Sequence, residues 1–305
     1  LNNTNDDLMI ANTARVSFNN WNDELDLSLN AKGNKKDPTL INYLARHEHI
    51  SPFFHIRFTF KFAHNEIDLL AITDPTMLMG MVYRKDPYTI TVRTSFYGWV
   101  RLAYSVLLSP SASIKVQKTL QHYAPYAYDA YFDNTYFDNI YNKPEDLSVD
   151  VDDPLFQDAS IRITDALPVV RQMFTHRMFA TNEVSRRYVS TEPSLHFHKQ
   201  WRNKPEGSIK QGSGALVDPK TQVMADRVYG IAMDAGVNGY MNLLDLGVAP
   251  EQARYILPQA MKTDVIFTGS IQAWKDVISK RTYSGAQQEV RDLAYDIQHH
   301  LASSS

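Results

Sequence analysis

Large apolar side chains occupy every second position in residues 54–62, and this pattern limits the possible folds more than any other feature of the chain. Phe54, Ile56, Phe58, Phe60 and Phe62 alternate with His55, Arg57, Thr59 and Lys61. Successive side chains of an extended strand point to opposite faces, so the apolar set shares one face. The segment is predicted to be a half-buried β-strand, and the same alternation predicts a second strand at residues 88–96.

Elsewhere the apolar residues recur every three or four positions, which predicts helices. Asp37 resembles an N-cap followed by proline, and residues 284–287 resemble a capping box for the last helix. The longest helix is expected to end at Gly247 and to bury a stripe made of Met224, Val228, Ile231, Ala232 and Ala235. The predicted helices cover residues 8–14, 37–44, 97–108, 221–246, 250–258, 271–281 and 287–301.

The bulk composition is that of an ordinary globular protein, with 305 residues, a net charge of −3 and 44% hydrophobic residues. One large α/β domain can have this length. A general basic excess is absent, so nucleic acid is not expected as a partner. No run reaches the roughly 18 apolar residues of a membrane span, and the polar first residues do not resemble a signal peptide. No membrane association and a cytoplasmic location are therefore expected.

Residues 171–191 bring many polar groups together beside an apolar stripe. The stripe consists of Ile163, Leu167, Val170, Phe174 and Met178, whose spacing predicts a helix that runs into this stretch. Thr181 and Asn182 are poor helix formers, and residues 184–189 alternate loosely, so an extended segment is expected to follow the helix. The polar groups indicate a binding site, although a solvated, salt-bridged surface would show the same pattern.

The same stretch resembles the flavin-dependent thymidylate synthases. That family carries Arg-His-Arg, seven residues and then serine, and His176-Arg177 followed by Ser185 reproduces this spacing. Residues 182–188, Asn-Glu-Val-Ser-Arg-Arg-Tyr, are similar to the downstream half of the motif. One position departs from the family pattern, because Thr175 stands where the first arginine is expected.

Further blocks resemble the family in the same order along the chain. Residues 14–18 and 47–53 resemble segments near the flavin and in the flavin and folate pocket. Residues 254–258 resemble Arg-x-x-Leu-Pro, and residues 268–274 resemble Thr-Gly-Asn-x-Arg-Ala-Trp with Ser270 and Gln272 in place of the asparagine and the arginine. Phe54 and Gly285 also depart, since glutamate and histidine are usual there.

The resemblance implies the fold and the reaction. The expected fold class is α/β of the α+β type: a single domain over residues 1–305, with a central, mostly antiparallel sheet, long helices and an insertion at residues 63–160. The implied reaction is reductive methylation of dUMP to dTMP. FAD would carry hydride, methylenetetrahydrofolate would donate the one-carbon unit, and NADPH would be the reductant. A homotetramer is also implied.

The resemblance further implies which residues contact each ligand. Those expected at dUMP are Gln172, Glu183, Ser185, Arg186, Arg187, Arg254 and Arg281. Those expected at FAD and folate are Ser17, His49, Ser51, Thr175, His176, Arg177, Glu183, Tyr188, Ser270, Gln272 and Asp276. The residue types suit these tasks, because paired arginines can bind a phosphate in a bidentate manner.

Arg281 is the candidate catalytic residue. It follows Ile271, Trp274 and Ile278 on the apolar face of a predicted helix, a position suited to binding a specific anion or carbonyl. A fixed cation beside a pyrimidine carbonyl stabilises the negative charge that builds when N3 loses its proton or C6 receives hydride. Cysteine is absent, which excludes disulfides, thiolate metal sites and a cysteine nucleophile. Methylation of uracil would have to proceed without one.

Some of these residues also permit other interpretations. His47 and His49 flank a glutamate, but two histidines at i and i+2 in a loop lack the partners of a zinc site, so no metal is predicted. Ser185 could serve a hydrolase, yet no nucleophile elbow surrounds it, and it is interpreted as a binding residue. The departures at Thr175, Ser270 and Gln272 leave open a nucleotide- or flavin-binding relative that has lost activity.

Two irregular segments complete the sequence. Residues 193–214 are predicted to be a long loop that could act as a flap. Its Gly-x-Gly lacks the strand-to-helix setting of a dinucleotide-binding motif. Residues 123–141 are rich in Tyr, Phe, Asp and Asn, and they could stack on bases. Their acidic neighbours favour a packing or oligomer surface instead.

Overall fold

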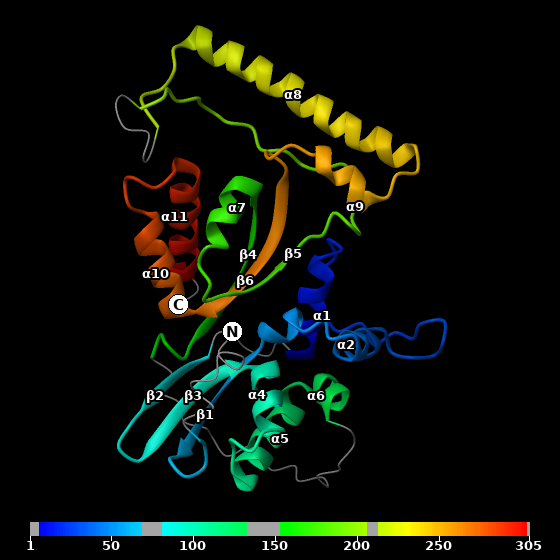
Figure 1. Cartoon of the computed structure of the whole chain (residues 1–305), viewed down its shortest axis with the longest axis vertical. Coiled ribbons are helices and arrows are strands. Elements are labelled where there is room, and N and C mark those ends of the chain that lie inside the picture. The colour runs from blue at the N-terminus through cyan, green and yellow to red at the C-terminus, as the bar shows by residue number, and fades with distance from the viewer. Residues whose placement is uncertain (1–5, 69–80, 133–152, 206–212, 304–305) are drawn as a thin grey trace. The chain divides into compact units, whose positions relative to one another are not determined.

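The structure is a computed structural model that describes residues 6–68, 81–132, 153–205 and 213–303 (Figure 1). Helices and strands are mixed, which confirms the predicted α+β class. The chain divides into two compact units. Unit 1 consists of residues 1–161, 178–182 and 266–271, and unit 2 consists of residues 162–177, 183–265 and 272–305.

Unit 1 contains a three-stranded antiparallel sheet with the strand order β1-β3-β2. The strands are β1 (Arg57–Ala63), β2 (Val82–Lys85) and β3 (Thr89–Ser95). Strand β1 pairs with β3 along its whole length, with Arg57 opposite Ser95. Both predicted strands are present, and Phe60 and Phe62 are buried as the period of two requires. The prediction of a strand from Phe54 is wrong at its start, because Phe54 lies in a short helical turn and β1 begins at Arg57.

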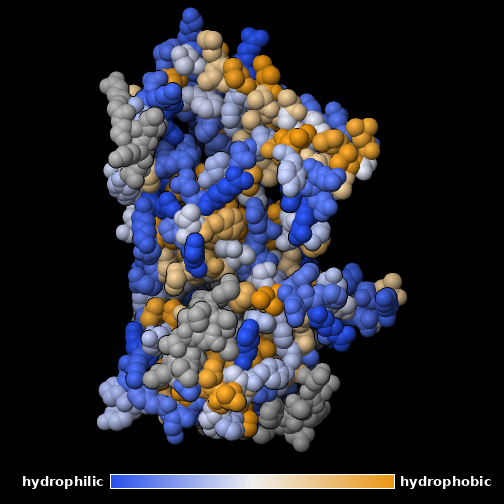
Figure 2. Space-filling view, in the orientation of Figure 1, coloured by the Kyte–Doolittle hydropathy of each residue, from blue (hydrophilic) through white to orange (hydrophobic). Residues whose placement is uncertain are grey.

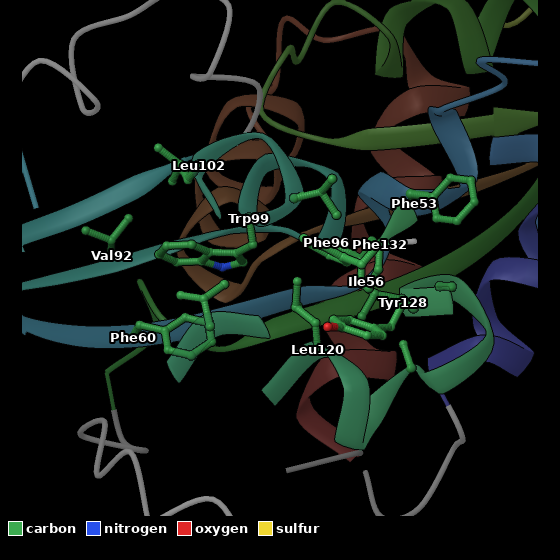
Figure 3. Packing of buried hydrophobic residues seen from close by; sticks show 14 of the residues in the cluster. Phe53, Ile56, Phe60, Val92, Phe96, Trp99, Leu102, Leu120, Tyr128 and Phe132 are labelled. Atoms are coloured by element: carbon green, nitrogen blue, oxygen red, sulfur yellow. The ribbon is translucent and has the colours of Figure 1, made fainter. Parts of the chain in front are cut away.

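In the described part of unit 1, six helical segments accompany this sheet: α1 (Asp6–Val16), α2 (Lys36–Arg46), η1 (Ser51–Phe54), α4 (Phe96–Ala103), α5 (Pro110–Tyr123) and α6 (Pro125–Tyr131). Trp99 of α4 lies in the core that they form with the sheet (Figure 3). Its ring packs edge-on against Phe60 with centroids 4.6 Å apart, and its indole N–H donates to the carbonyl of Phe58 at 2.9 Å. The buried indole thus has a polar partner as well as an aromatic one.

A buried ion cluster in unit 1 ties strands β1 and β3 to Asp158. Asp158 accepts hydrogen bonds from Arg57 at 3.1 Å and from Arg93 at 2.5 Å. Arg93 also donates to the hydroxyl of Thr59 at 2.7 Å. All three charged side chains are at most 14% exposed. Asp158 therefore neutralises buried cations that no solvent shell could stabilise.

In a second buried network of unit 1, the donor of each hydrogen bond can be assigned. Asn182 donates its amide N–H to the carbonyl of Thr13, so its oxygen faces Nε2 of His55 at 3.2 Å. Nε2 must then donate, and Nδ1 accepts from the hydroxyl of Thr268 at 2.8 Å. Thr268 in turn accepts from Ser160 at 2.7 Å. Burial lowers the pKa of His55 to about 4, against the opposing hydrogen bond to Asn182, so the histidine is neutral.

The second sheet has the strand order β4-β6-β5, and each of its strands has residues in both units. The strands are β4 (Asp158–Ala166), β5 (Ala180–Glu183) and β6 (Lys262–Ser270). The helices in the described part of unit 2 are α7 (Leu167–Met173), α8 (Pro219–Asp245), α9 (Pro250–Ala253), η2 (Arg254–Ile256), α10 (Ile271–Arg281) and α11 (Gln288–Ser303). The first residue of α10, Ile271, is assigned to unit 1. None of the helices in the described ranges combines the length and apolar character that crossing a bilayer needs.

The prediction of one helix through Ile163 and Met178 is wrong. Ile163 belongs to strand β4, helix α7 covers only residues 167–173, and Met178 is exposed. The residues of β4 largely alternate between buried and less buried positions, as in a strand. Ile163 is four positions before Leu167, and this distance fits a period of two as well as a helical spacing. The extended segment was expected at 184–189, but β5 ends at Glu183.

Two predicted helix starts also need correction. Asp37 does not cap α2, which begins at Lys36, because its carboxylate instead accepts from Arg15 and from the amide of Asp26. Ser284 does not cap α11, since that helix begins only at Gln288. The predicted helix at 97–108 exists but ends at Ala103. Both caps failed because a tertiary contact or a longer loop took priority over the local motif.

Part of the tyrosine-rich tract lies in helix α6, while residues 133–141 lie outside the described residues. Tyr128 and Tyr131 pack against the core of unit 1. In the described part of the tract, the aromatic side chains therefore take part in packing, the alternative favoured over base stacking.

Helix α8 extends over residues 219–245 as predicted, and Gly247 follows it with a φ of +81°, a left-handed conformation that suits glycine. The predicted stripe is not buried: Met224, Val228 and Ile231 are 60–68% exposed. Figure 2 shows hydrophobic residues on the surface over this helix. Within the described part of unit 2, α8 therefore presents an apolar face to solvent.

Candidate functional site

Gln172, Thr175, His176 and Arg281, four of the predicted polar residues, meet in unit 2, where α7, α10 and α11 lie side by side (Figure 1). Helix α7 ends at Met173, and the turn after it carries Thr175 and His176. Arg281 is the last residue of α10. The cationic side chain of Arg281 thereby meets a main-chain carbonyl in the last turn of α7, and the partial negative charge at a helix C-terminus favours a cation there.

Three of the five N–H groups of Arg281 are already used within the protein. Its Nε donates to Nε2 of His176 at 2.9 Å. Its Nη2 donates to the main-chain carbonyl of Gln172 at 3.1 Å and to the hydroxyl of Thr175 at 2.9 Å. Among the described residues nothing accepts a hydrogen bond from Nη1 of Arg281. A rigidly held guanidinium therefore keeps two N–H donors for a ligand.

Thr175 completes this arrangement. Its hydroxyl donates to the carbonyl of Gln172 at 2.7 Å while it accepts from Arg281. The resemblance assigned Thr175 to the flavin, but in this structure its side chain supports Arg281. An arginine at this position would carry no acceptor for the Arg281 guanidinium.

His176 is held as a neutral ring. Because its Nε2 accepts from Arg281, the ring proton must be on Nδ1. Partial burial, followed by the nearby charges of Arg281 and Lys280, lowers its pKa, and Asp276 opposes this shift. Protonation of His176 would place a second cation against Arg281 and break the bond between them.

Gln172 links this cluster to α11. Its amide nitrogen donates to the oxygen of Gln287 at 2.6 Å, and Gln287 donates its own amide nitrogen to Glu289 at 2.9 Å. Glu289 also accepts from Arg202 at 2.5 Å. The long loop predicted at 193–214 is thus anchored to α11 where the structure describes it. Motif reading missed Gln287, Glu289 and Arg202, because only tertiary folding brings them to Gln172.

Glu183 lies at the end of β5 and accepts from the hydroxyl of Thr263 at 2.9 Å. Burial raises its pKa, whereas the bond from Thr263 and the charge of Arg171 lower it. Thr263, on strand β6, is a further contact that the motif did not predict. The carboxyl group is thus held in a fixed place where it can orient a hydroxyl or an N–H of a ligand.

Ser185, Arg186, Arg187 and Tyr188 follow in the next turn. Arg186 donates to the carbonyl of Thr191 at 2.6 Å, and Arg187 lies over the ring of Tyr188, 5.1 Å from its centroid. The hydroxyl of Ser185 accepts weakly from Arg187 at 3.4–3.5 Å. Within the described chain no histidine is hydrogen-bonded to Ser185, so the arrangement of a serine hydrolase is not formed.

Two of the remaining predicted residues bond to near neighbours in the sequence. Arg254 donates to the carbonyl of its neighbour Glu251 at 3.3 Å, and Asp276 pairs with Lys280 at 2.6 Å. Arg177 and Gln272 are exposed. The residues that belong to unit 1 are Ser17, His49, Ser51 and Ser270.

The described residues also contain no group of acidic, histidine or cysteine side chains that could hold a metal ion. The ring of His47 stacks on Tyr43 with centroids 4.0 Å apart, and His49 meets the same tyrosine edge-on at 6.1 Å. Both histidines are exposed and are oriented by these ring contacts.

The chain is similar in sequence to proteins of one known family. Residues 1–70 and 159–304 match the family model described as thymidylate synthase complementing protein. A flavin-dependent thymidylate synthase of Aquifex aeolicus (strain VF5) is 28% identical over 94% of this chain and 92% of its own length. One from Kosmotoga olearia is 29% identical over 41% of this chain, a match that spans 54% of the relative.

Among solved structures, a UMP/dUMP methylase, PolB from Streptomyces cacaoi bound with 5-Br UMP, is similar over 97% of this chain and 84% of its own. The sequence identity is 16% and the TM-score is 0.45.

Proposed function

Since the chain belongs to the family of thymidylate synthase complementing proteins, the flavin-dependent thymidylate synthases, we propose that it methylates dUMP reductively to dTMP. In the balanced reaction dUMP, methylenetetrahydrofolate, NADPH and a proton give dTMP, tetrahydrofolate and NADP⁺. The observation that carries the proposal is the state of Arg281, which is fixed on three sides and keeps two N–H donors.

Arg281 is proposed to act on the uracil ring. An N–H group of Nη1 on a fixed cation can donate to a pyrimidine carbonyl and stabilise the negative charge that develops on its oxygen as the ring is reduced. His176, Thr175 and the carbonyl of Gln172 hold the guanidinium in place before the ligand arrives. Preorganisation of this kind requires no rearrangement at the moment of reaction.

Arg186 and Arg187 are proposed to bind the phosphate of dUMP, with Arg254 assisting. Arg187 is exposed, and among the described residues its side chain makes one weak hydrogen bond, to Ser185, and lies over the ring of Tyr188. Arg186 retains donors beyond the one used on Thr191. Guanidinium groups with unused donors suit a dianionic phosphate. Glu183, held by Thr263, is proposed to orient the nucleotide through a hydrogen bond.

FAD, the cofactor that the family implies, fits some of the residues assigned to it. Arg177 is exposed and has neither a hydrogen-bond partner nor an ion pair among the described residues, so it is available to a diphosphate. Gln272 is also exposed, whereas Thr175 is committed to Arg281 and Ser270 is buried. We assign Arg177 and Gln272 as the residues of unit 2 that hold it. When bound, FAD supplies hydride.

Two further features complete the proposal. Methylenetetrahydrofolate is the proposed one-carbon donor and NADPH the reductant, and Ser17, His49 and Ser51 are the unit 1 residues proposed to contact the cofactors. The exposed apolar face of α8 supports self-association into a homotetramer. Residues 71–158 are unmatched by the family model, in keeping with an insertion at 63–160.

The proposal is tested by the spectrum and by thiol alkylation. The purified chain incubated with FAD should show bound flavin absorbance, and dUMP should perturb that spectrum. Turnover should be unchanged by iodoacetamide, because the chain contains no cysteine. A chain that binds no FAD would instead support the alternative of a relative that has lost activity. Loss of turnover on mild alkylation would contradict a mechanism without a thiol.

A further inference from the structure

Glu289 occupies the first turn of α11 and is ionised. Burial disfavours its charge, but hydrogen bonds from Gln287 and Arg202, together with the Arg202 charge, lower its pKa. Arg202 donates to one carboxylate oxygen and Gln287 to the other. An ionised carboxylate can only accept hydrogen bonds, so Gln287 must present its amide N–H to it.

This requirement passes from one amide to the next. Because the amide nitrogen of Gln287 donates to Glu289, Gln287 must present its amide oxygen to Gln172. Gln172 must then donate to that oxygen from its own amide nitrogen. The amide oxygen of Gln172 is then left without a hydrogen-bond partner in the described part of the chain. The same residue gives its main-chain carbonyl to Arg281. The cluster therefore offers a ligand one acceptor, on Gln172, and two donors, on Nη1 of Arg281.

We propose that Glu289, acting through Gln287, is a positioning residue that turns the amide oxygen of Gln172 outward so that it accepts from N3–H of uracil. This inference rests on the proposed function. Uracil presents an N–H at N3 between two carbonyl oxygens, which matches one acceptor beside guanidinium donors. Cytosine has an unprotonated N3 and an amino group at C4, so it places an acceptor and a donor where uracil has the opposite. The relay makes the site selective for uracil nucleotides.

Glu289→Gln provides a sharp test, because Arg202 can only donate. The introduced amide has to turn its oxygen to Arg202 and its nitrogen to Gln287. Gln287 must then reverse, and Gln172 must reverse after it, which presents an N–H to the ligand. Removing Arg202 as well, in Arg202→Met with Glu289→Gln, frees the introduced amide to keep the original direction.

The measurement is the ratio of dissociation constants for dCMP and dUMP, obtained by calorimetry on the full chain loaded with FAD. The wild type should prefer dUMP, and Glu289→Gln should lower the ratio by about tenfold or more, since a hydrogen-bonding site rejects a mismatched partner strongly. Arg202→Met alone should keep the wild-type ratio, and the double variant should recover part of the loss. Gln287→Leu, at an exposed side chain, should also lower the ratio.

Two results would overturn the inference. A folded Glu289→Gln variant with the wild-type ratio would show that the relay does not set specificity. If that variant does not fold, an unchanged ratio in Gln287→Leu would show the same. Failure of the wild type to bind dUMP at all would contradict the proposed function itself, and so would be distinguishable from a preference that survives both substitutions.

Discussion

Arg281 donates its Nε–H to Nε2 of His176 over 2.9 Å, and this bond ties the position of the guanidinium to the protonation state of the histidine. A ring nitrogen that accepts cannot carry a proton, so the bond exists only while His176 is neutral. Partial burial and the Arg281 charge lower the pKa of His176 in keeping with this. The remaining hydrogen bonds of Arg281 run to Gln172 and Thr175, which do not titrate.

The first prediction concerns pH. Because the folded-state pKa of His176 lies below its ordinary value, its contribution is fully present above about pH 6.5 and is lost as pH falls through the folded pKa. Affinity for dUMP should weaken as the pH falls below this range. His176→Gln keeps an acceptor that cannot be protonated, so it should reduce this loss of affinity at acid pH. The measurement is dUMP affinity against pH for both forms. An equal loss of dUMP affinity at acid pH in the two forms would exclude His176 as its cause.

The second prediction concerns the guanidinium itself. Arg281→Ala should reduce turnover by roughly 100-fold or more, because it removes preorganised stabilisation of charge on the ring. Arg281→Lys should recover only part, since an ammonium cannot contact His176, Gln172 and a ligand with one planar fork. The measurement is the steady-state turnover rate of the wild type and both variants at saturating dUMP. Turnover like that of the wild type in Arg281→Ala would remove the residue from the mechanism.

The third prediction concerns the departures from the family motif. Each charge-assisted hydrogen bond to the FAD phosphates is worth roughly 1.5–3 kcal/mol, and Thr175 and Gln272 supply none. Thr175→Arg combined with Gln272→Arg should therefore tighten FAD by at least about tenfold, or about 1.4 kcal/mol. Fluorescence titration of FAD at one salt concentration measures this. Equal dissociation constants would show that the chain compensates elsewhere.

The two substitutions should differ in their effect on turnover. Gln272 is exposed and has no hydrogen-bond partner among the described residues, so Gln272→Arg alone should leave turnover near that of the wild type. Thr175→Arg should lower it, because the hydroxyl that accepts from Arg281 is lost. Thr175→Ser keeps that hydroxyl and is the matched control. A Thr175→Arg variant with full turnover would show that Arg281 needs no support there.

The fourth prediction concerns stability. Asp158→Asn should destabilise the fold by about 3–5 kcal/mol, because Arg57 and Arg93 would remain buried without a counter-charge. Chemical denaturation measures the change in the free energy of unfolding. Asp264→Asn, which removes a more exposed pair with Arg162, is the matched control and should cost roughly 1 kcal/mol or less. Equal losses in the two variants would contradict the account of the buried cluster.

The sequence predicts the elements well where one period dominates. Strand β1 follows from the alternation that ends at Phe62, and α8 from a long helical spacing. The pattern fails at Ile163, where residues three and four apart happened to be apolar in a strand. It also fails for the face of α8, because spacing shows that a helix has an apolar side but not what covers that side.

The candidate site follows the same rule. Arg281, His176 and Gln172 could each be named from the family resemblance, although their mutual contacts join residues 105 and 109 positions apart. Glu289 and Arg202 belong to none of the resembling motifs, and only the fold shows their contact across 87 positions. The role of Thr175 was also out of reach, because the partner of its hydroxyl is set by the end of α10. Motifs identify residue types, whereas the hydrogen-bond directions come from the fold.

The central claim is that this chain converts dUMP to dTMP with a bound flavin and without a thiol. The most direct test is to detect dTMP by mass spectrometry after incubating dUMP, methylenetetrahydrofolate and NADPH with the chain loaded with FAD, and to omit each component in turn. The account predicts that dTMP forms only in the complete mixture and that Arg281→Ala abolishes most of it. No dTMP from a chain that demonstrably holds FAD and binds dUMP would contradict the account.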